Sequence, residues 1–106
     1  VDAASAATKH ELLEWGGANP LFACLQLDDE IVLKLACGAL QNLCQHPAWC
    51  SVALANGVHN TLEHLLEHND MTIVRFASGS LRNMQIGLQR VGQQLPELGS
   101  AARQLV

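Results

Sequence analysis

The sequence predicts an all-α fold built from repeated three-helix units, and three observations lead to it. Two long segments match one another at an offset of 41 residues. Apolar residues inside the matching segments recur at helical spacing, and we expect this side of each helix to be buried: Val32, Leu35, Ala36, Ala39, Leu40 and Leu43, then Ile73, Phe76, Ala77, Leu81 and Met84, with Ser80 matching Ala39. Hydrophobic residues make up 49% of the 106 residues, but only 4% are aromatic and none is Tyr. A core made of Leu, Val, Ile and Ala favours helices packed on helices over a β-sandwich.

The repeat is clearest where the segment 32–43, VLKLACGALQNL, is compared with the segment 73–84, IVRFASGSLRNM. Four identities mark the match, and they pair Ala36 with Ala77, Gly38 with Gly79, Leu40 with Leu81, and Asn42 with Asn83. Further identities at the same offset lie upstream, at Leu13 and Leu54, Gly16 and Gly57, Asn19 and Asn60, Leu21 and Leu62, Leu25 and Leu66, and Asp29 and Asp70. Because the agreement extends over nearly a whole period, we interpret the chain as two consecutive repeats, and we expect their third helices to pack side by side.

The first repeat, about residues 8–46, is predicted to hold three helices. A helix from Thr8 to Trp15 ends at Gly16-Gly17, since glycine readily takes the left-handed conformation that follows a helix. A second helix begins near Asn19-Pro20, where Asn can cap and Pro suits the first turn, and runs to about Leu27. The third helix is expected over Asp29–Gln45, with acids at its start.

The second repeat, about residues 47–87, has the same predicted order. Its helices are expected at Pro47–Ala55, Asn60–His68 and Asp70–Gln85, with Gly57 as the break between the first two. Residues 88–106 match the repeat only weakly. We therefore expect them to form a partial repeat or a cap that closes the stack, or a partly disordered end.

These units resemble the armadillo repeat, which has a short helix, a glycine break, two longer helices and an ending like AAGALRNL. In this chain the endings are ACGALQNL at 36–43 and ASGSLRNM at 77–84. The resemblance covers about residues 8–87 and implies a right-handed α-solenoid. In armadillo proteins the matching Asn faces an inner groove and bonds the main chain of an extended peptide, because an amide both donates and accepts.

The resemblance and the charge pattern together indicate a partner-binding face on the two third helices. Its candidate residues are Lys34, Gly38, Gln41, Asn42, Arg75, Gly79, Arg82 and Asn83. The alternative for the asparagines is that they tie down a neighbouring helix or loop. Nuclear-import receptors of the family carry Trp where this chain has glycine, one turn before the Asn. That departure argues against recognition of a basic import signal and predicts a shallow floor instead.

The charges are segregated along the chain. The net charge is −4, yet the predicted third helices carry Lys34, Arg75 and Arg82, with Arg90 beyond them, and no acid from 31 to 45 or from 71 to 91. This pattern favours an acidic or amphipathic peptide partner and excludes a basic nucleic-acid footprint. The alternative is that these are solvated charges with no partner. No apolar run is long enough for a membrane span, and the start of the chain does not resemble a signal peptide.

Cysteine and histidine offer only weak metal or redox patterns. Cys37 and Cys44 lie roughly 10 Å apart along one helix face, too far to bridge. All four cysteines, at 24, 37, 44 and 50, are expected to be reduced thiols of a cytoplasmic protein. Neither the pair His64 and His68 nor the cluster Cys44, His46 and Cys50 has a full ligand pattern, so no metal and no cofactor is expected. Trp15 and Trp49 are expected to be packing anchors at repeat junctions; the alternative, for a tryptophan that is exposed, is a contact with a partner.

The sequence shows no nucleophile–base pair and no phosphate-binding loop, so we expect no enzyme and no catalytic residue. The first hypothesis is a protein-binding scaffold module that uses the concave third-helix face. The second is an assembly element of a junction, centriole, cilium or polarity scaffold, which packs against other repeats or self-associates through its exposed ends. The third is a metal- or redox-responsive domain. Because the chain starts at Val1, we expect it to be a fragment of a longer protein; the alternative is a start produced by processing.

Overall fold

The computed structural model describes the backbone of residues 3–96 and the side chains of residues 7–96. All regular structure in this part of the chain is helical, as the sequence predicts, and no strand occurs in it. The helices are α1 (Ala3–Glu14), α2 (Ala18–Cys24), α3 (Glu30–Leu43), α4 (Pro47–Ala55), α5 (Val58–Leu65) and α6 (Met71–Arg90).

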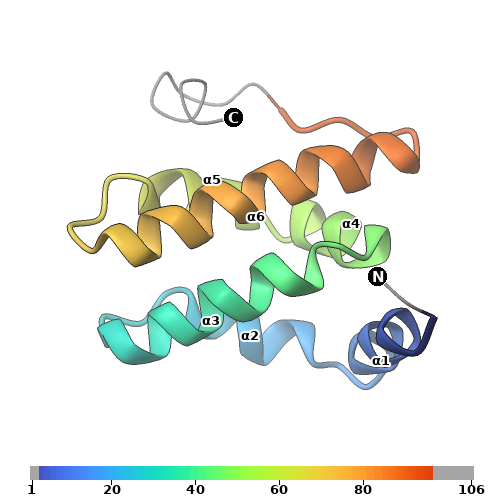
Figure 1. Cartoon of the computed structure of the whole chain (residues 1–106), viewed down its shortest axis with the longest axis horizontal. Helices are drawn as coiled ribbons and strands as arrows, with labels where there is room; N and C mark the ends of the chain where they lie inside the picture. Colours follow the sequence, from blue (N-terminus) through green and yellow to red (C-terminus); the bar gives the residue numbers. More distant parts are fainter. Residues whose placement is uncertain (1–2, 97–106) are drawn as a thin grey trace.

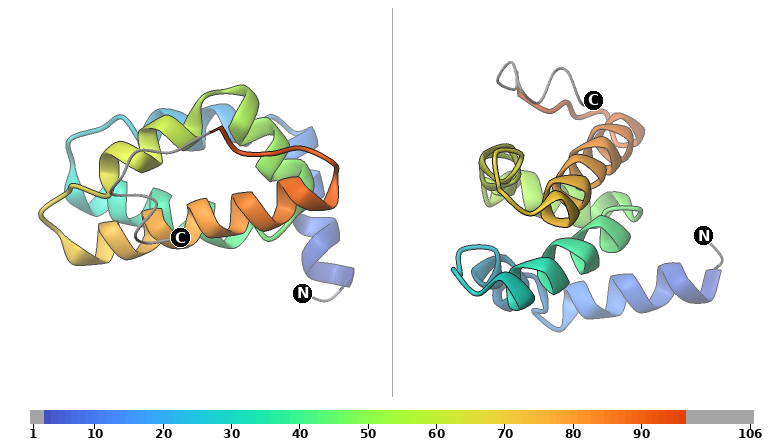
Figure 2. Two further views of the ribbon diagram at one scale, coloured as in Figure 1. Left: turned by 90° about the horizontal axis from the view of Figure 1, so that it is seen from above. Right: turned by 60° about the vertical axis from the view of Figure 1, so that its left-hand side comes forward.

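The helices follow one another in two sets of three, α1 to α3 and α4 to α6 (Figure 1). The third helices of the two sets, α3 and α6, run in the same direction and pack side by side, as expected. Helices α2 and α5 lie behind them, and α1 and α4 lie toward one end (Figures 1 and 2). This arrangement makes α3 and α6 the neighbours whose contacts decide the shape of the predicted binding face.

Local capping explains where the third helices begin. The side chain of Asp29 accepts hydrogen bonds from two amides in the first turn of α3, and Asp70 does the same for α6. Each carboxylate satisfies amides that have no partner inside the helix. Gly16 and Gly57 adopt φ angles of 81° and 72°, the left-handed region that favours glycine, so the predicted breaks are confirmed.

Several predicted boundaries were wrong. Helix α1 begins at Ala3 rather than Thr8, and α5 covers Val58–Leu65 rather than Asn60–His68. Helix α2 covers Ala18–Cys24, so it ends before Leu27, and its cap is Gly17, without a side-chain hydrogen bond; Asn19 lies inside the helix.

Helix α6 crosses the predicted end of the second repeat and continues to Arg90. Gly87 does not break it, because this glycine is buried where a Cβ would meet the sulfur and Cβ of Cys50 in α4. The next residue, Leu88, is fully buried. The extra turn is therefore held by packing against α4, which a sequence pattern does not display.

The core lies between the two sets of helices and contains the repeat-matched leucines. Leu40 and Leu81 are fully buried, together with Leu62, Ile73, Met84 and Leu88. In α6 the predicted apolar positions are all buried or half-buried. In α3 the prediction fails for Leu35 and Ala39, which are exposed.

The two tryptophans differ sharply in environment. Trp49 is buried against Phe22, with ring centroids 6.3 Å apart, and its Nε1 donates to the carbonyl of Lys9 at 2.7 Å. The Nζ of Lys9 in turn donates to Oε1 of Gln45 at 3.1 Å. Trp49 is thus a packing anchor that joins α1 to α4, as expected. Trp15 is 84% exposed, so the expectation that it is an anchor was wrong.

The segment after α6 turns back along the molecule. Ser51 Oγ of α4 donates to Oε1 of Gln93 at 2.6 Å, and Leu95 packs against the core. The rest of the predicted cap, residues 97–106, lies outside the described residues. Within the described residues, none of the helices is both long enough and apolar enough to cross a membrane.

Candidate protein-binding face

The candidate residue Lys34 on α3 is already paired inside the chain. Its Nζ lies 2.9 Å from Oδ2 of Asp70, the residue that caps α6. The hydrogen bond with this carboxylate raises the pKa of Lys34, and the same bond lowers the pKa of Asp70. Lys34 therefore links the start of α6 to the middle of α3, and its charge is not fully available to a partner.

The two glycines allow α3 and α6 to approach closely. The Phe76 ring of α6 lies 3.4 Å from the place where a Cβ on Gly38 would stand. On the opposite helix, a Cβ on Gly79 would collide with the side-chain amide of Gln41. The shallow floor predicted for a partner is thus occupied in part by the chain's own Phe76 and Gln41 side chains.

The repeat-matched asparagines are not equivalent in the structure. The Nδ2 of Asn83 donates to the main-chain carbonyl of Gln41 at 2.8 Å, and the side chain is half-buried. This carbonyl lies in the last turn of α3. In a continuing helix it would accept from the amide of Gln45, but that amide donates to the carbonyl of Asn42. Asn83 thus satisfies the end of the neighbouring helix, the alternative that the sequence left open. Asn42 is exposed on α3.

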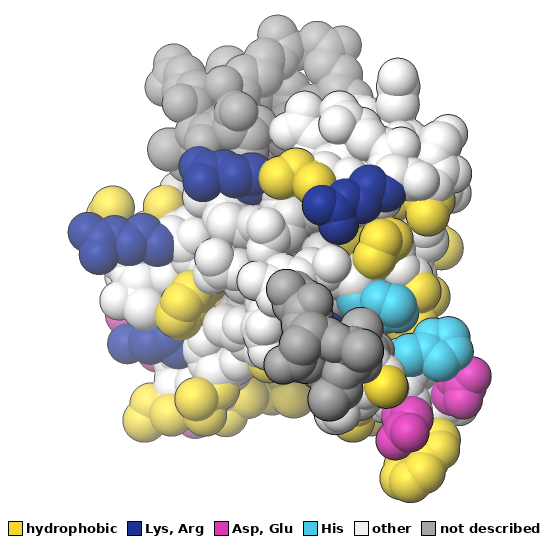
Figure 3. Space-filling view, turned by 45° about the vertical axis from the view of Figure 1, so that its right-hand side comes forward, with side chains coloured by type: hydrophobic (Ala, Val, Ile, Leu, Met, Phe, Trp, Pro, Cys, Tyr) yellow, Lys and Arg dark blue, Asp and Glu magenta, His cyan; other side chains and the backbone are white. Residues whose placement is uncertain are grey.

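Three arginines of α6 form the exposed cationic part of the face. Arg75, Arg82 and Arg90 are seven and eight residues apart, which is about two helical turns, and all three side chains are exposed. Among the described residues none of them forms an ion pair, and α6 itself contains no acid. We call these three residues the arginine face. On the face seen in Figure 3, Lys and Arg side chains lie apart from the Asp and Glu side chains at the lower right, with hydrophobic side chains between some of them.

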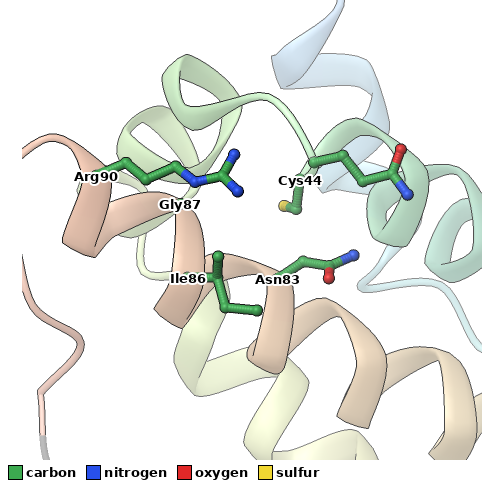
Figure 4. Close-up of a pocket in the computed structure, with 6 residues that line it drawn as sticks. Cys44, Asn83, Ile86, Gly87 and Arg90 are labelled. Atoms are coloured by element: carbon green, nitrogen blue, oxygen red, sulfur yellow. The ribbon is translucent and has the colours of Figure 1, made fainter. Parts of the chain in front are cut away.

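A pocket of ≈ 350 Å³ adjoins the arginine face at the ends of α3 and α6. In Figure 4, Asn83, Ile86 and Arg90 project from α6, and Cys44 lies across the opening. Gln45 and the buried Gly87 complete the lining. The pocket combines an amide, an apolar side chain and a guanidinium, which suits a ligand that is both acidic and partly apolar.

The buried cysteines behave mainly as core residues, and all four are free thiols. Burial raises the pKa of Cys37 to about 11. The hydrogen bond between Cys44 and Cys50, together with burial, raises the pKa of Cys44 far above the ordinary value of a thiol. The same bond lowers the pKa of Cys50. The Cys50 sulfur donates to the carbonyl of Cys44 at 3.0 Å, so this thiol also caps the end of α3. Cys37 and Cys44 therefore stay protonated near neutral pH.

Within the described residues, the histidines do not gather into a set of metal ligands. His68 Nδ1 accepts a hydrogen bond from the amide of Asp70 at 3.0 Å, which orders the loop before α6. His59 is buried and His64 is exposed. Across residues 7–96, no three His, Cys, Asp or Glu side chains lie close enough together to hold a metal ion.

Comparison of the chain with protein-family models, with curated proteins and with solved structures finds no match. The resemblance to the armadillo repeat therefore rests on the internal repeat and its motif alone. It stays a prediction.

Sequence reasoning missed two groups of exposed residues, one at the pocket and one on another side of α3. Ile86 and Arg90 were separated from the site because the helix was expected to end at Gln85; their spacing from Arg82 and Asn83 was the signal that could have included them. Ile31 and Leu35 on α3 were missed as an exposed apolar pair. The matched residues in α6 are Thr72 and Phe76, and comparing the two pairs could have suggested that one pair is exposed. Only the structure shows that Phe76 packs on a neighbouring helix while Leu35 does not.

Proposed function

We propose that this chain is a non-catalytic protein-binding module, part of an armadillo-type right-handed α-solenoid, and that it holds an acidic or amphipathic segment of a protein partner. The segment would lie along the arginine face of α6 and place an apolar side chain in the adjoining pocket. Lys34, Gly38, Gln41 and Gly79 would then shape the α3–α6 contact beneath the partner rather than bind it directly.

One observation carries this proposal. A chain of net charge −4 exposes three arginines on one helix that contains no acid, and no ion pair within the described residues neutralises them. Segregated cations on an acidic molecule attract and orient an acidic partner, and they disfavour basic ones. The partner would be a protein segment because the pocket beside Arg90 also offers Ile86 and the amide of Asn83.

Asn83 fits this role through its oxygen. Its Nδ2 is used on Gln41, but its Oδ1 accepts no hydrogen bond among the described residues. An oxygen at the pocket edge can accept from a main-chain amide of an extended segment, which would fix the register of that segment. Asn42 lies on the neighbouring helix, outside the pocket lining.

The proposal is tested with a fluorescein-labelled peptide of about twelve residues that carries glutamates around one central leucine, followed by fluorescence anisotropy. The variant Arg75→Gln with Arg82→Gln removes two charges from the arginine face. Ala23→Glu with Asn60→Glu is the control, because it changes the net charge equally on exposed positions of α2 and α5.

We expect the arginine variant to weaken binding roughly two- to thirtyfold, since an exposed ion pair contributes about 0.2–1 kcal/mol and tenfold is about 1.4 kcal/mol. The loss should shrink as salt rises from about 50 to about 500 mM, because salt screens exposed charges. Equal loss in the arginine variant and the control would show that only net charge matters and that the arginine face is not the site.

A second candidate function, structural assembly with other helical units, is favoured by one observation. Ile31 and Leu35 on α3 are largely exposed, although they lie on a helix whose other sides are packed. Large apolar side chains that stand together on a surface often mark a contact with another protein.

A further inference from the structure

Helix α3 has one side that the described residues leave open. Ile31 and Leu35 are four residues apart, so they lie on one side of α3, where they are 72% and 70% exposed. Ala39 and Asn42 continue along the same side and are exposed as well. Helices α2 and α6 pack against other parts of α3. We call Ile31, Leu35, Ala39 and Asn42 the open face.

The internal repeat shows what the equivalent side of α6 does. At the offset of 41 residues, Leu35 matches Phe76 and Asn42 matches Asn83. The Phe76 ring packs over Gly38 of α3, and Asn83 donates to the carbonyl of Gln41 in α3. The side of α6 that carries Phe76 and Asn83 is therefore the side that packs on α3.

The charge at the start of the helix follows the same match. Asp70 caps α6 and also pairs with Lys34 of the preceding third helix. Asp29 caps α3 in the same way, but it forms no ion pair within the described part of the chain. An apolar side chain, an amide donor and a carboxylate thus stand on α3 in the arrangement that α6 uses to bind α3.

We propose that the open face docks the third helix of a further unit of the α1–α3 type, placed before α1. That helix would present a cation to Asp29, a glycine to Leu35, and a free main-chain carbonyl to Asn42. These are the roles of Lys34, Gly38 and Gln41 in the contact between α3 and α6. The proposal deepens the second candidate function, assembly with other helical units, and it concerns a different surface from the arginine face, so it does not depend on peptide binding there.

A second copy of the chain offers a poorer match. Its α6 carries Arg75, Gly79 and Arg82 at the required spacing. However, Arg82 lies eight residues before the end of α6, so its carbonyl is used within the helix, whereas α3 ends two residues after Gln41. The segment with Gln94 and Leu95 also lies beside the outer side of α6. The occupant we propose is therefore a separate α1–α3 unit.

The test is a tandem chain in which residues 6–46 are placed directly before residues 6–106, which keeps the 41-residue offset. Thermal unfolding followed by circular dichroism compares the tandem with the original chain, each with and without Leu35→Glu in the copy that precedes α4. Met71→Glu is the matched control: Met71 is an exposed apolar residue that matches Glu30 and lies outside the open face.

We expect Leu35→Glu to lower the Tm of the tandem by about 8 °C or more, because it introduces a charge into a buried contact. In the original chain, where Leu35 is exposed, the change should stay below about 2 °C. Met71→Glu should change neither chain by more than about 2 °C. A tandem that is indifferent to Leu35→Glu overturns the proposal.

Two further measurements keep the test decisive if the tandem does not fold. A synthetic peptide of residues 29–46 is titrated into the isotope-labelled original chain, and amide shifts are expected at Ile31, Leu35 and Asn42. Absent shifts, or shifts that a scrambled peptide reproduces, contradict the proposal.

The second measurement is sedimentation of the original chain. Self-association that Leu35→Glu abolishes would assign the open face to a second copy and overturn the proposed occupant.

Discussion

At the scale of single residues, the same side chain does different work in the two matched repeats. Asn42 and Asn83 match in sequence, but only Asn83 has a helix end within reach, and it donates to the carbonyl of Gln41. Lys34 and Arg75 also match, yet Lys34 is paired with Asp70 while Arg75 is exposed. The sequence predicts which positions matter in a repeat, but the neighbour that each position meets depends on which helices stand beside it.

Asn83→Ala should therefore destabilise the chain more than Asn42→Ala. Losing the hydrogen bond to Gln41 costs about 0.5–1.5 kcal/mol. Both changes replace Asn by Ala inside or near the end of a helix, so the gain in helix propensity is similar and the difference between them isolates the contact. Urea unfolding of both variants checks this. Equal stabilities would show that Asn83 contributes no more than an exposed amide.

Asp70→Asn should reduce stability at neutral pH, and the reduction should vanish in acid. The hydrogen bond from Lys34 holds the pKa of Asp70 below its ordinary value of 3.8. A carboxyl group whose pKa is lower in the folded state stabilises the fold above its unfolded pKa, and this contribution is lost as pH falls through the folded pKa. The Tm gap between wild type and variant should thus begin to narrow near about pH 4 and close as the pH falls below the folded pKa of Asp70.

The control for this pH dependence is Asp29→Asn, which removes the same capping charge from α3 where no ion pair exists among the described residues. Asn still caps a helix well, so each variant keeps its cap. A gap as large for Asp29→Asn as for Asp70→Asn would show that the bridge to Lys34 contributes nothing measurable.

At the scale of helices, local signals and tertiary contacts can be separated. The starts of α3 and α6 were predictable because an aspartate at each start accepts bonds from its own first turn. The breaks at Gly16 and Gly57 were also predictable from local sequence, because glycine adopts the left-handed conformation without steric cost. The end of α6 was not, because the close approach of Gly87 to Cys50 and the burial of Leu88 are tertiary contacts that a sequence pattern does not show. The pocket was hidden with it, since Ile86 and Arg90 belong to that last turn.

Leu40→Ala and Leu81→Ala should each cost about 2–5 kcal/mol, because both leucines are fully buried in the core between the helices. Leu35→Ala is the control, since the same substitution on the same helix removes a side chain that is 70% exposed, and it should change stability by less than about 0.5 kcal/mol. Thermal or urea unfolding measures all three. A Leu35→Ala cost comparable to that of Leu40→Ala would contradict the assignment of the open face.

At the scale of the whole molecule, the proposed function rests on how the two sets of helices divide the surface. Their shared third-helix side exposes the arginine face, and the other side of α3 exposes apolar residues. The all-α class and the side-by-side third helices were predictable from the 41-residue repeat. That Leu35 and Asn42 stay exposed, while the matched residues Phe76 and Asn83 pack on α3, was not predictable, because matched sequence positions do not meet the same neighbours.

The central claim, that the arginine face binds an acidic segment, is tested most directly by nuclear magnetic resonance. The isotope-labelled chain is titrated with the unlabelled glutamate–leucine peptide. The account predicts amide shifts that centre on Arg75, Arg82, Ile86 and Arg90, and that Arg75→Gln with Arg82→Gln suppresses. Shifts centred on Ile31 and Leu35, or spread evenly over α2 and α5, would contradict it.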